Sequence, residues 1–137
     1  MFGTALALAA FIAWTLLLLL LMEALRSHLV LTGRVPANGF TPDNQGLSPF
    51  LQRLARAHLN CVESLPVFGG LMLLAIATHR TAMTDPLAAV LVVARIVQST
   101  IHLASTSAPA VTLRFAAFAV QLAIAAWWTF GLLRALA

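Results

Sequence analysis

Three polar side chains lie close together in residues 56–68, which read RAHLNCVESLPVF. Arg56, Asn60 and Glu63 follow one another at spacings of four and three, so on a helix they fall within about 60° and share one stripe. A guanidinium, an amide and a carboxylate on one stripe can hold a polar ligand by charge pairing and hydrogen bonds. The same groups can also form a structural network between helices, and the spacing leaves both roles open.

The sequence around this stripe is apolar enough for a lipid bilayer. Of the 137 residues, 61% are hydrophobic and 9% charged, and the mean hydropathy is +0.96, which lies outside the range of soluble domains. A charge near the bilayer centre costs about 2.5–3.5 kcal/mol on insertion scales, so the stripe must face protein or water. We therefore expect an integral membrane protein.

Charge and cysteine content exclude several other classes. The basic residues are all arginines, and they are spread along the chain instead of clustering on one face, so we expect no nucleic acid as a partner. The single cysteine, Cys61, excludes an internal disulfide and a CxxC redox or zinc site. We predict no metal site.

Four apolar segments are long enough to span a bilayer, which takes roughly 20 residues. They cover about residues 4–26, 49–78, 86–104 and 109–134. Three of them begin at a proline with a capping residue just before it, in Ser48-Pro49, Asp85-Pro86 and Ser107-Ala108-Pro109. The first segment lacks a basic start and a cleavage site, so it reads as a transmembrane helix and not as a signal peptide. We predict an all-α fold, one domain over residues 1–137 built as an up-down bundle of four transmembrane helices.

The long first loop carries the information on orientation. The loop covers residues 27–48. Together with its flanks it contains one aspartate and four arginines, Arg26, Arg34, Arg53 and Arg56. The positive-inside rule therefore places the first and third loops in the cytoplasm. The second helix, roughly 45 Å long at 1.5 Å per residue, exceeds the roughly 30 Å hydrocarbon core and projects on that side. A polar ligand can then reach the stripe from the cytoplasm.

The third and fourth helices supply polar groups at matching depths. His102, Gln98 and Arg95 follow one another at helical spacing on the third helix. Arg114 lies near the start of the fourth helix, with Gln121 two turns further on the same face. All of this polarity converges on one half of the membrane.

Residues 56–68 resemble the second-helix signature of the MAPEG family (membrane-associated proteins in eicosanoid and glutathione metabolism), R-A-x-x-N-x-x-E-x-x-P-x-F. A long first loop of the GRVPANGF type, an arginine in the third helix and another at the start of the fourth agree with that family. The resemblance implies a homotrimer with sites between neighbouring subunits that open to the cytoplasm. It also implies a multi-pass protein of the bacterial inner membrane or the endoplasmic reticulum.

The resemblance implies glutathione as co-substrate, with Arg56, Asn60 and Glu63 as its ligands. The chemistry fits, because arginines pair with its two carboxylates, a glutamate with its ammonium group, and an asparagine with its peptide amides. The rest of the predicted glutathione-binding set is Arg26, His58, Arg95 and Gln98. We predict Arg114, which stabilises the thiolate, and His102 as catalytic residues.

The chain departs from the family pattern because it contains no tyrosine. Glutathione-using members carry tyrosines where this chain has Ser64, Gln98 and His102. Our leading hypothesis is a glutathione transferase or peroxidase that acts on lipophilic electrophiles, which are hydrophobic small molecules from the bilayer. The alternative is a family member that binds lipid or a partner protein without chemistry. A channel or transporter ranks third, since the sequence shows no interrupted helix or inverted repeat.

Overall fold

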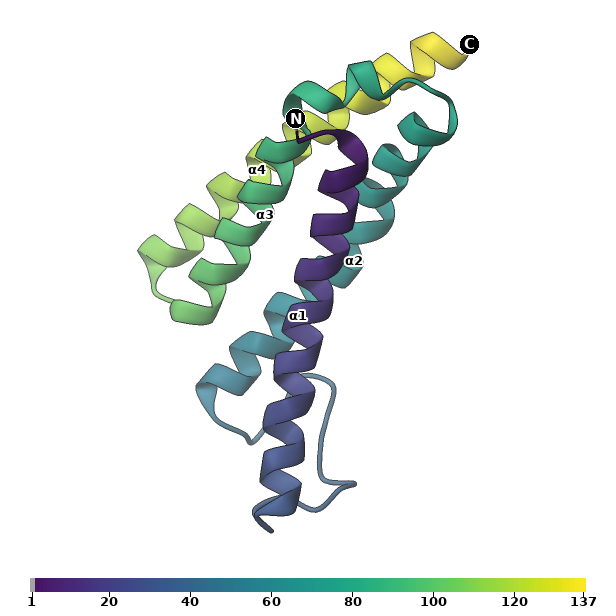
Figure 1. The fold of residues 1–137 in the computed structure, drawn as a ribbon. Helices are drawn as coiled ribbons and strands as arrows, with labels where there is room; N and C mark the ends of the chain where they lie inside the picture. The colour runs from purple at the N-terminus through teal and green to yellow at the C-terminus, as the bar shows by residue number, and fades with distance from the viewer. Residues whose placement is uncertain (1) are drawn as a thin grey trace.

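The computed structural model describes residues 2–137, which form four long helices and one short 3-10 helix. In chain order these are α1 (Thr4–Leu31), α2 (Pro49–Ala77), η1 (Thr81–Met83), α3 (Asp85–Ala104) and α4 (Ala108–Leu136). Successive long helices run in opposite directions, so both chain ends lie at the same end of the bundle (Figure 1). All four long helices have the length and apolar composition to cross a membrane. The chain is therefore an all-α, multi-pass integral membrane protein, as predicted.

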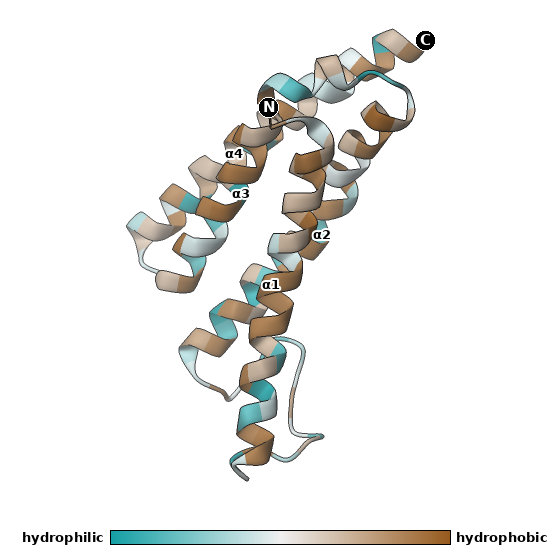
Figure 2. Ribbon diagram, in the orientation of Figure 1, coloured by the Kyte–Doolittle hydropathy of each residue, from teal (hydrophilic) through white to brown (hydrophobic). Residues whose placement is uncertain are grey.

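The helices pack as two pairs that meet along α3. α1 lies along α2, α3 lies along α4, and α3 contacts both α1 and α2 between the pairs. The core of this arrangement contains large buried apolar side chains, among them Phe11, Leu54, Phe68, Met72 and Trp128. Many leucines and valines are exposed instead. Figure 2 shows that apolar residues run along all four long helices. An outward apolar surface of this extent suits contact with lipid or with another membrane helix.

Two of the helices, α2 and α4, begin just after a serine cap, as the sequence predicts. The Ser48 hydroxyl oxygen accepts the Leu51 N–H at 3.3 Å, and the Ser107 hydroxyl oxygen accepts the Ala110 N–H at 3.4 Å. The first helix is capped from another helix, because the Asp85 carboxylate accepts both the backbone N–H and the hydroxyl of Thr4, at 2.7 and 2.6 Å. Both kinds of cap satisfy first-turn N–H groups that have no partner within their own helix.

The first helix continues to Leu31, beyond the predicted end at Arg26. The polar run after Leu25 indicated a loop, but polarity alone does not end a helix at a membrane surface. Gly33 ends it, with a φ of +70° and an N–H that donates to the Val30 carbonyl at 3.0 Å. A glycine adopts this left-handed conformation without steric cost, which makes it the usual residue just after a helix end.

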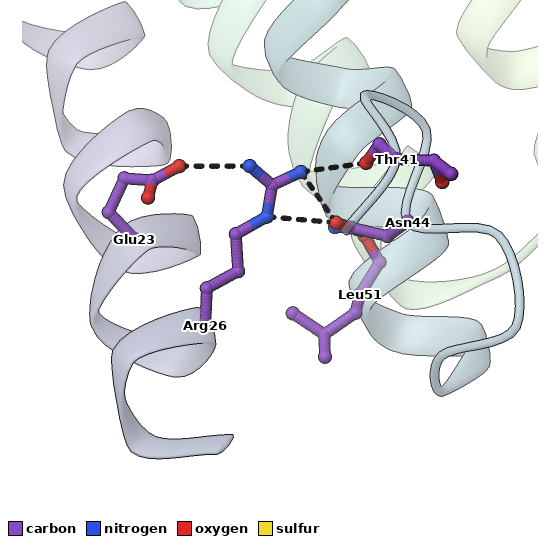
Figure 3. Close-up of polar contacts among 5 residues, drawn as sticks. All are labelled: Glu23, Arg26, Thr41, Asn44 and Leu51. Carbon is purple, nitrogen blue, oxygen red and sulfur yellow. Dashed lines mark hydrogen bonds and ion pairs between the residues drawn. The ribbon is translucent and has the colours of Figure 1, made fainter. Parts of the chain in front are cut away.

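Arg26 fastens the first loop to α1 (Figure 3). Its Nε and Nη2 donate to the Asn44 side-chain oxygen at 2.9 and 2.6 Å, Nη2 also reaches the Thr41 carbonyl at 3.1 Å, and Nη1 pairs with Glu23 at 3.1 Å. Asn44 is fully buried, and its amide donates to the Leu51 carbonyl of α2 at 2.8 Å. One guanidinium thus ties together α1, the loop and the start of α2.

A small turn within the same loop carries an acid with a shifted pKa. The Asp43 carboxylate accepts the Thr41 hydroxyl at 2.6 Å and the Gln45 N–H at 3.2 Å. The bond from Thr41, followed by that from Gln45, holds the pKa of Asp43 below its ordinary value, because both bonds favour the ionised form.

Candidate functional site

A cleft between α2 and the α3–α4 pair has two halves that meet at Asn60 and Arg114. One half encloses about 510 Å³ and is mainly polar. Its other lining residues are Pro49, Gln52, Arg53, Arg56, His102 and Thr106. The second half encloses about 550 Å³ and is mainly apolar, with α4 supplying much of its wall. Its apolar lining consists of Val67, Phe68, Val111, Phe115, Phe118 and Leu122.

Three arginines, Arg53, Arg56 and Arg114, line the polar half. Arg53 donates from Nε to the Leu103 carbonyl at 2.8 Å, and this carbonyl belongs to the last turn of α3, where a cation is favourable. Arg56 is exposed. Arg53 was absent from the predicted set, although it lies three residues before Arg56 on the same helical stripe and was detectable there.

Asn60 and His102 lie side by side at the junction of the two halves. The Asn60 Nδ2 and His102 Nδ1 atoms are 3.5 Å apart, at the long limit for a hydrogen bond, and His102 is buried. The structure therefore brings together these two residues of the predicted site, from α2 and from the last turn of α3. The Ser64 hydroxyl instead donates back to the Asn60 carbonyl of its own helix.

Glu63 lines the apolar half and is exposed. Between residues 2 and 137 the one ion pair is that of Arg26 with Glu23, so no arginine of this part of the chain pairs with Glu63. Arg56 and Glu63 thus present opposite charges outward from a membrane-spanning helix. Such charges are costly against lipid, so they require a ligand, water or another protein surface as a neighbour.

Arg95 is the most deeply buried charge among the described residues, with an exposed fraction of 1%. Its Cζ lies 5.6 Å from the ring centres of Phe11 and Phe68 and 5.9 Å from that of Phe118. Each such cation–π contact contributes about 0.5–2 kcal/mol, which offsets part or all of the burial cost of the charge. The rings do not provide hydrogen-bond acceptors for the Arg95 guanidinium. Its Nε and Nη2 have no partner within residues 2–137, and its Nη1 has only the Asn60 carbonyl at 3.5 Å.

Gln98 and Gln121 join α3 to α4 by a hydrogen bond between their side chains. The Gln121 Nε2 donates to the Gln98 Oε1 at 2.9 Å, and Gln121 is fully buried. Gln98 also lines the apolar half of the cleft. The pair places neutral hydrogen-bonding groups at a position where the family pattern led us to look for tyrosine.

Arg114 lies where the two halves of the cleft meet, and its catalytic role stays a prediction. It is half-buried, it lines both halves of the cleft, and its Nε has no hydrogen-bond partner in the described chain. Arg26 and His58 line neither half, and the donors of Arg26 are taken by the first loop. The glutathione-binding role of these two residues stays a prediction. Residues 2–137 contain no group of three metal-binding side chains.

Comparison with known families identifies the class of protein. The model of the MAPEG family matches residues 4–134, which is nearly the whole chain. The chain therefore belongs to the MAPEG family, in agreement with the resemblance of its α2 sequence. Comparison with curated proteins and with solved structures finds no match.

Proposed function

We propose that the protein is a membrane-bound glutathione transferase or peroxidase that acts on lipophilic electrophiles. The observation that carries this proposal is the meeting of a polar and an apolar half-cleft at one half-buried arginine, Arg114. A reaction between a charged tripeptide thiol and a hydrophobic molecule needs both environments, with the thiolate at their boundary. Family membership supports the choice of glutathione as the thiol.

The polar half, together with Glu63 of the apolar half, offers groups that complement glutathione. Arg53 and Arg56 suit its two carboxylates, because a guanidinium pairs with a carboxylate through two parallel hydrogen bonds. Glu63, which has no ion pair within the described chain, suits the ammonium group. Asn60 suits a peptide amide, since its side chain both donates and accepts.

Arg114 supplies the electrostatic stabilisation that the thiolate needs. Lowering a thiol pKa from about 8.5 to about 6.5 takes roughly 2.7 kcal/mol of preferential stabilisation, which one partly desolvated guanidinium can provide. The thiol proton passes to solvent on binding, and the thiolate sulfur then attacks the electrophile. With an aryl halide a sulfur–carbon bond forms and halide leaves. With a hydroperoxide the sulfur bonds to the terminal oxygen as the oxygen–oxygen bond breaks, which gives a glutathione sulfenic acid and an alkoxide that takes a proton from water. The thiolate of a second glutathione then attacks the sulfenic sulfur, and hydroxide leaves as the disulfide forms.

The outward charges of α2 support assembly as a homotrimer with the site between subunits. Arg56 and Glu63 are exposed on a single chain, and a neighbouring subunit together with glutathione would cover them. The arginine bias of the first loop supports a cytoplasmic opening, in the bacterial inner membrane or the endoplasmic reticulum.

The test is thiolate formation and turnover in purified protein. We expect a glutathione thiolate absorbance at neutral pH and conjugation of a generic aryl halide, with both strongly reduced in Arg114→Ala. Arg134→Ala is the matched control, because Arg134 is exposed near the opposite end of α4 and contacts only the Phe130 ring. A thiolate signal in Arg114→Ala as strong as that of wild type would mean that another cation stabilises the thiolate.

The second candidate is a non-catalytic protein of the same fold that binds lipid or a partner protein. The absence of tyrosine from the whole sequence favours it, because Arg114 must then act without a phenol donor. Glutathione that binds without forming a thiolate, or that does not bind at all, would support this candidate over the enzyme.

A further inference from the structure

The side-chain amide of Gln121 has a fixed orientation in the core of the bundle. Gln121 is fully buried, and its Nε2 donates to the Ala117 carbonyl of its own helix at 3.0 Å and to the Gln98 Oε1 at 2.9 Å. A backbone carbonyl can only accept a hydrogen bond, so the Gln121 atom that faces Ala117 must be the nitrogen. The amide therefore cannot turn over without placing its oxygen against that carbonyl.

The orientation of Gln121 determines the orientation of Gln98. The Gln98 atom that faces the Gln121 N–H must be the acceptor Oε1, so Nε2 lies on the other side of the Gln98 amide. This Nε2 is not buried and has no hydrogen-bond partner within residues 2–137. Because Gln98 lines the apolar half of the cleft, it offers that half a hydrogen-bond donor and not an acceptor.

The other polar groups of the apolar half cannot replace this donor. The polar residues that line this half without lining the polar half are Glu63, Ser64, Arg95 and Gln98. The Glu63 carboxylate accepts only, and the Ser64 hydroxyl already donates to the Asn60 carbonyl. The Nε and Nη2 of Arg95, which have no partner in the described chain, are buried. Among these residues, Gln98 thus supplies the uncharged donor that is both free and accessible.

The position of Gln98 favours a contact with the second substrate. Gln98 lines only the apolar half, whereas Arg114, where the proposed thiolate lies, lines both halves. The walls around Gln98 are mainly apolar side chains, such as Phe115 and Leu122. A hydrocarbon in this half would remove water from the Gln98 N–H without replacing the hydrogen bond, whereas a molecule with an acceptor oxygen would restore it.

We propose that Gln98 is a specificity-determining donor for the electrophile and that Gln121 is the residue that positions it. This inference rests on the proposed function and names its substrate class, an α,β-unsaturated carbonyl compound with an aliphatic tail. The sequence predicts Gln98 as a glutathione ligand, and the proposal assigns its donor to the electrophile instead.

The donor acts on the oxygen that becomes charged during the reaction. The thiolate sulfur bonds to the β-carbon, the electrons of the carbon–carbon double bond shift, and the negative charge moves to the carbonyl oxygen. That oxygen accepts the Gln98 N–H, which is already oriented before the substrate arrives. The enolate then takes a proton from water at its α-carbon, which completes the addition.

The experiment compares two electrophiles of equal chain length, trans-2-nonenal and 1-iodononane, with purified protein in nanodiscs. The iodide has no acceptor oxygen. We expect Gln98→Met and Gln121→Met each to lower kcat/KM for the enal by about tenfold or more. Both variants should leave kcat/KM for the iodide and the calorimetric Kd of glutathione nearly unchanged. Gln45→Met is the matched control and should change none of these values, because Gln45 is exposed in the first loop.

Two results would overturn the inference. Equal losses for both electrophiles in Gln121→Met would show a merely structural role, and a weaker glutathione affinity in Gln98→Met would return Gln98 to the glutathione ligands. If wild type turned over neither electrophile, the proposed function would fail, and infrared spectra would still decide the inference. The carbonyl stretch of unreactive 2-nonanone, labelled with ¹³C at the carbonyl, should fall in wild type and not in Gln98→Met or Gln121→Met. An unshifted band in wild type would refute the donor without any variant.

Discussion

Arg26 and Arg95 are both arginines within membrane-spanning helices, yet their surroundings differ. Arg26 lies at the end of the bundle and uses Nε, Nη1 and Nη2 on Asn44, Thr41 and Glu23 (Figure 3). Arg95 lies within the bundle among three phenyl rings, and two of its nitrogens have no partner in residues 2–137.

The difference separates an arginine whose hydrogen bonds hold the fold together from one whose N–H groups are mostly unpaired within residues 2–137. Every nitrogen of Arg26 already donates a hydrogen bond, so a ligand would have to displace the first loop to reach it. The phenyl rings compensate the charge of Arg95, but its Nε and Nη2 groups have no hydrogen-bond partner within residues 2–137. The same contrast distinguishes Arg26 from Arg56 and Glu63, which lack ion-pair partners within the described chain.

The largest expected effect is on glutathione binding. Arg56→Ala and Glu63→Gln should each weaken it by about 2–5 kcal/mol, because each leaves a charge of the ligand desolvated and unpaired. Arg26→Ala should leave the affinity of the folded protein nearly unchanged. Isothermal titration calorimetry in mild detergent measures all three variants. A loss in Arg26→Ala equal to that in Arg56→Ala would confirm the predicted role of Arg26 as a ligand and remove the contrast.

A smaller effect is expected on stability when Arg26 is removed. Arg26→Met breaks charge-assisted bonds worth about 1.5–3 kcal/mol each and leaves the buried Asn44 oxygen without a donor, so we expect destabilisation by about 2–3 kcal/mol. Thermal unfolding in detergent measures it, with Arg134→Met as control. Unchanged stability would mean that the network around the first loop is unimportant for the fold.

Arg95→Met should raise the stability of the protein, whereas Arg26→Met should lower it. Replacement of a buried charge by an apolar side chain of similar length removes a desolvation cost, so we expect about 1–2 kcal/mol of added stability. The same thermal unfolding assay compares this variant with Arg26→Met. Destabilisation of a similar size in both variants would show that the phenyl rings and the Asn60 carbonyl already stabilise the cation fully.

The smallest effect concerns Asp43. Because the Thr41 hydroxyl and the Gln45 N–H lower its folded-state pKa below 3.8, its contribution to stability is complete above that value and is lost as the pH falls through the folded-state pKa. A carbon-13 NMR titration of the Asp43 carboxyl should show this low pKa, and Thr41→Val should raise it. An Asp43 pKa that Thr41→Val leaves unchanged would mean that the turn does not depend on this bond.

Local sequence was sufficient to predict the four helices and the polar stripe of α2. A run of apolar residues sets the length of a spanning helix, and a fixed spacing sets which side chains share a face, so neither depends on the rest of the chain. The same holds for the caps at Ser48 and Ser107, since the capping group lies three residues from the N–H that it accepts. The signature of residues 56–68 likewise pointed to the correct family.

Packing between distant segments accounts for what the sequence did not show. The cap that Asp85 provides to Thr4 and the bonds between Arg26 and Asn44 join residues far apart in the chain, and no local pattern encodes such a pairing. The three phenyl rings around Arg95 come from α1, α2 and α4, so only the relative placement of the helices brings them together. The sequence alone could place Arg26 and Arg95 on helices but could not show their neighbours. Whether their hydrogen bonds are already satisfied depends on the neighbours, and these are set by the tertiary fold.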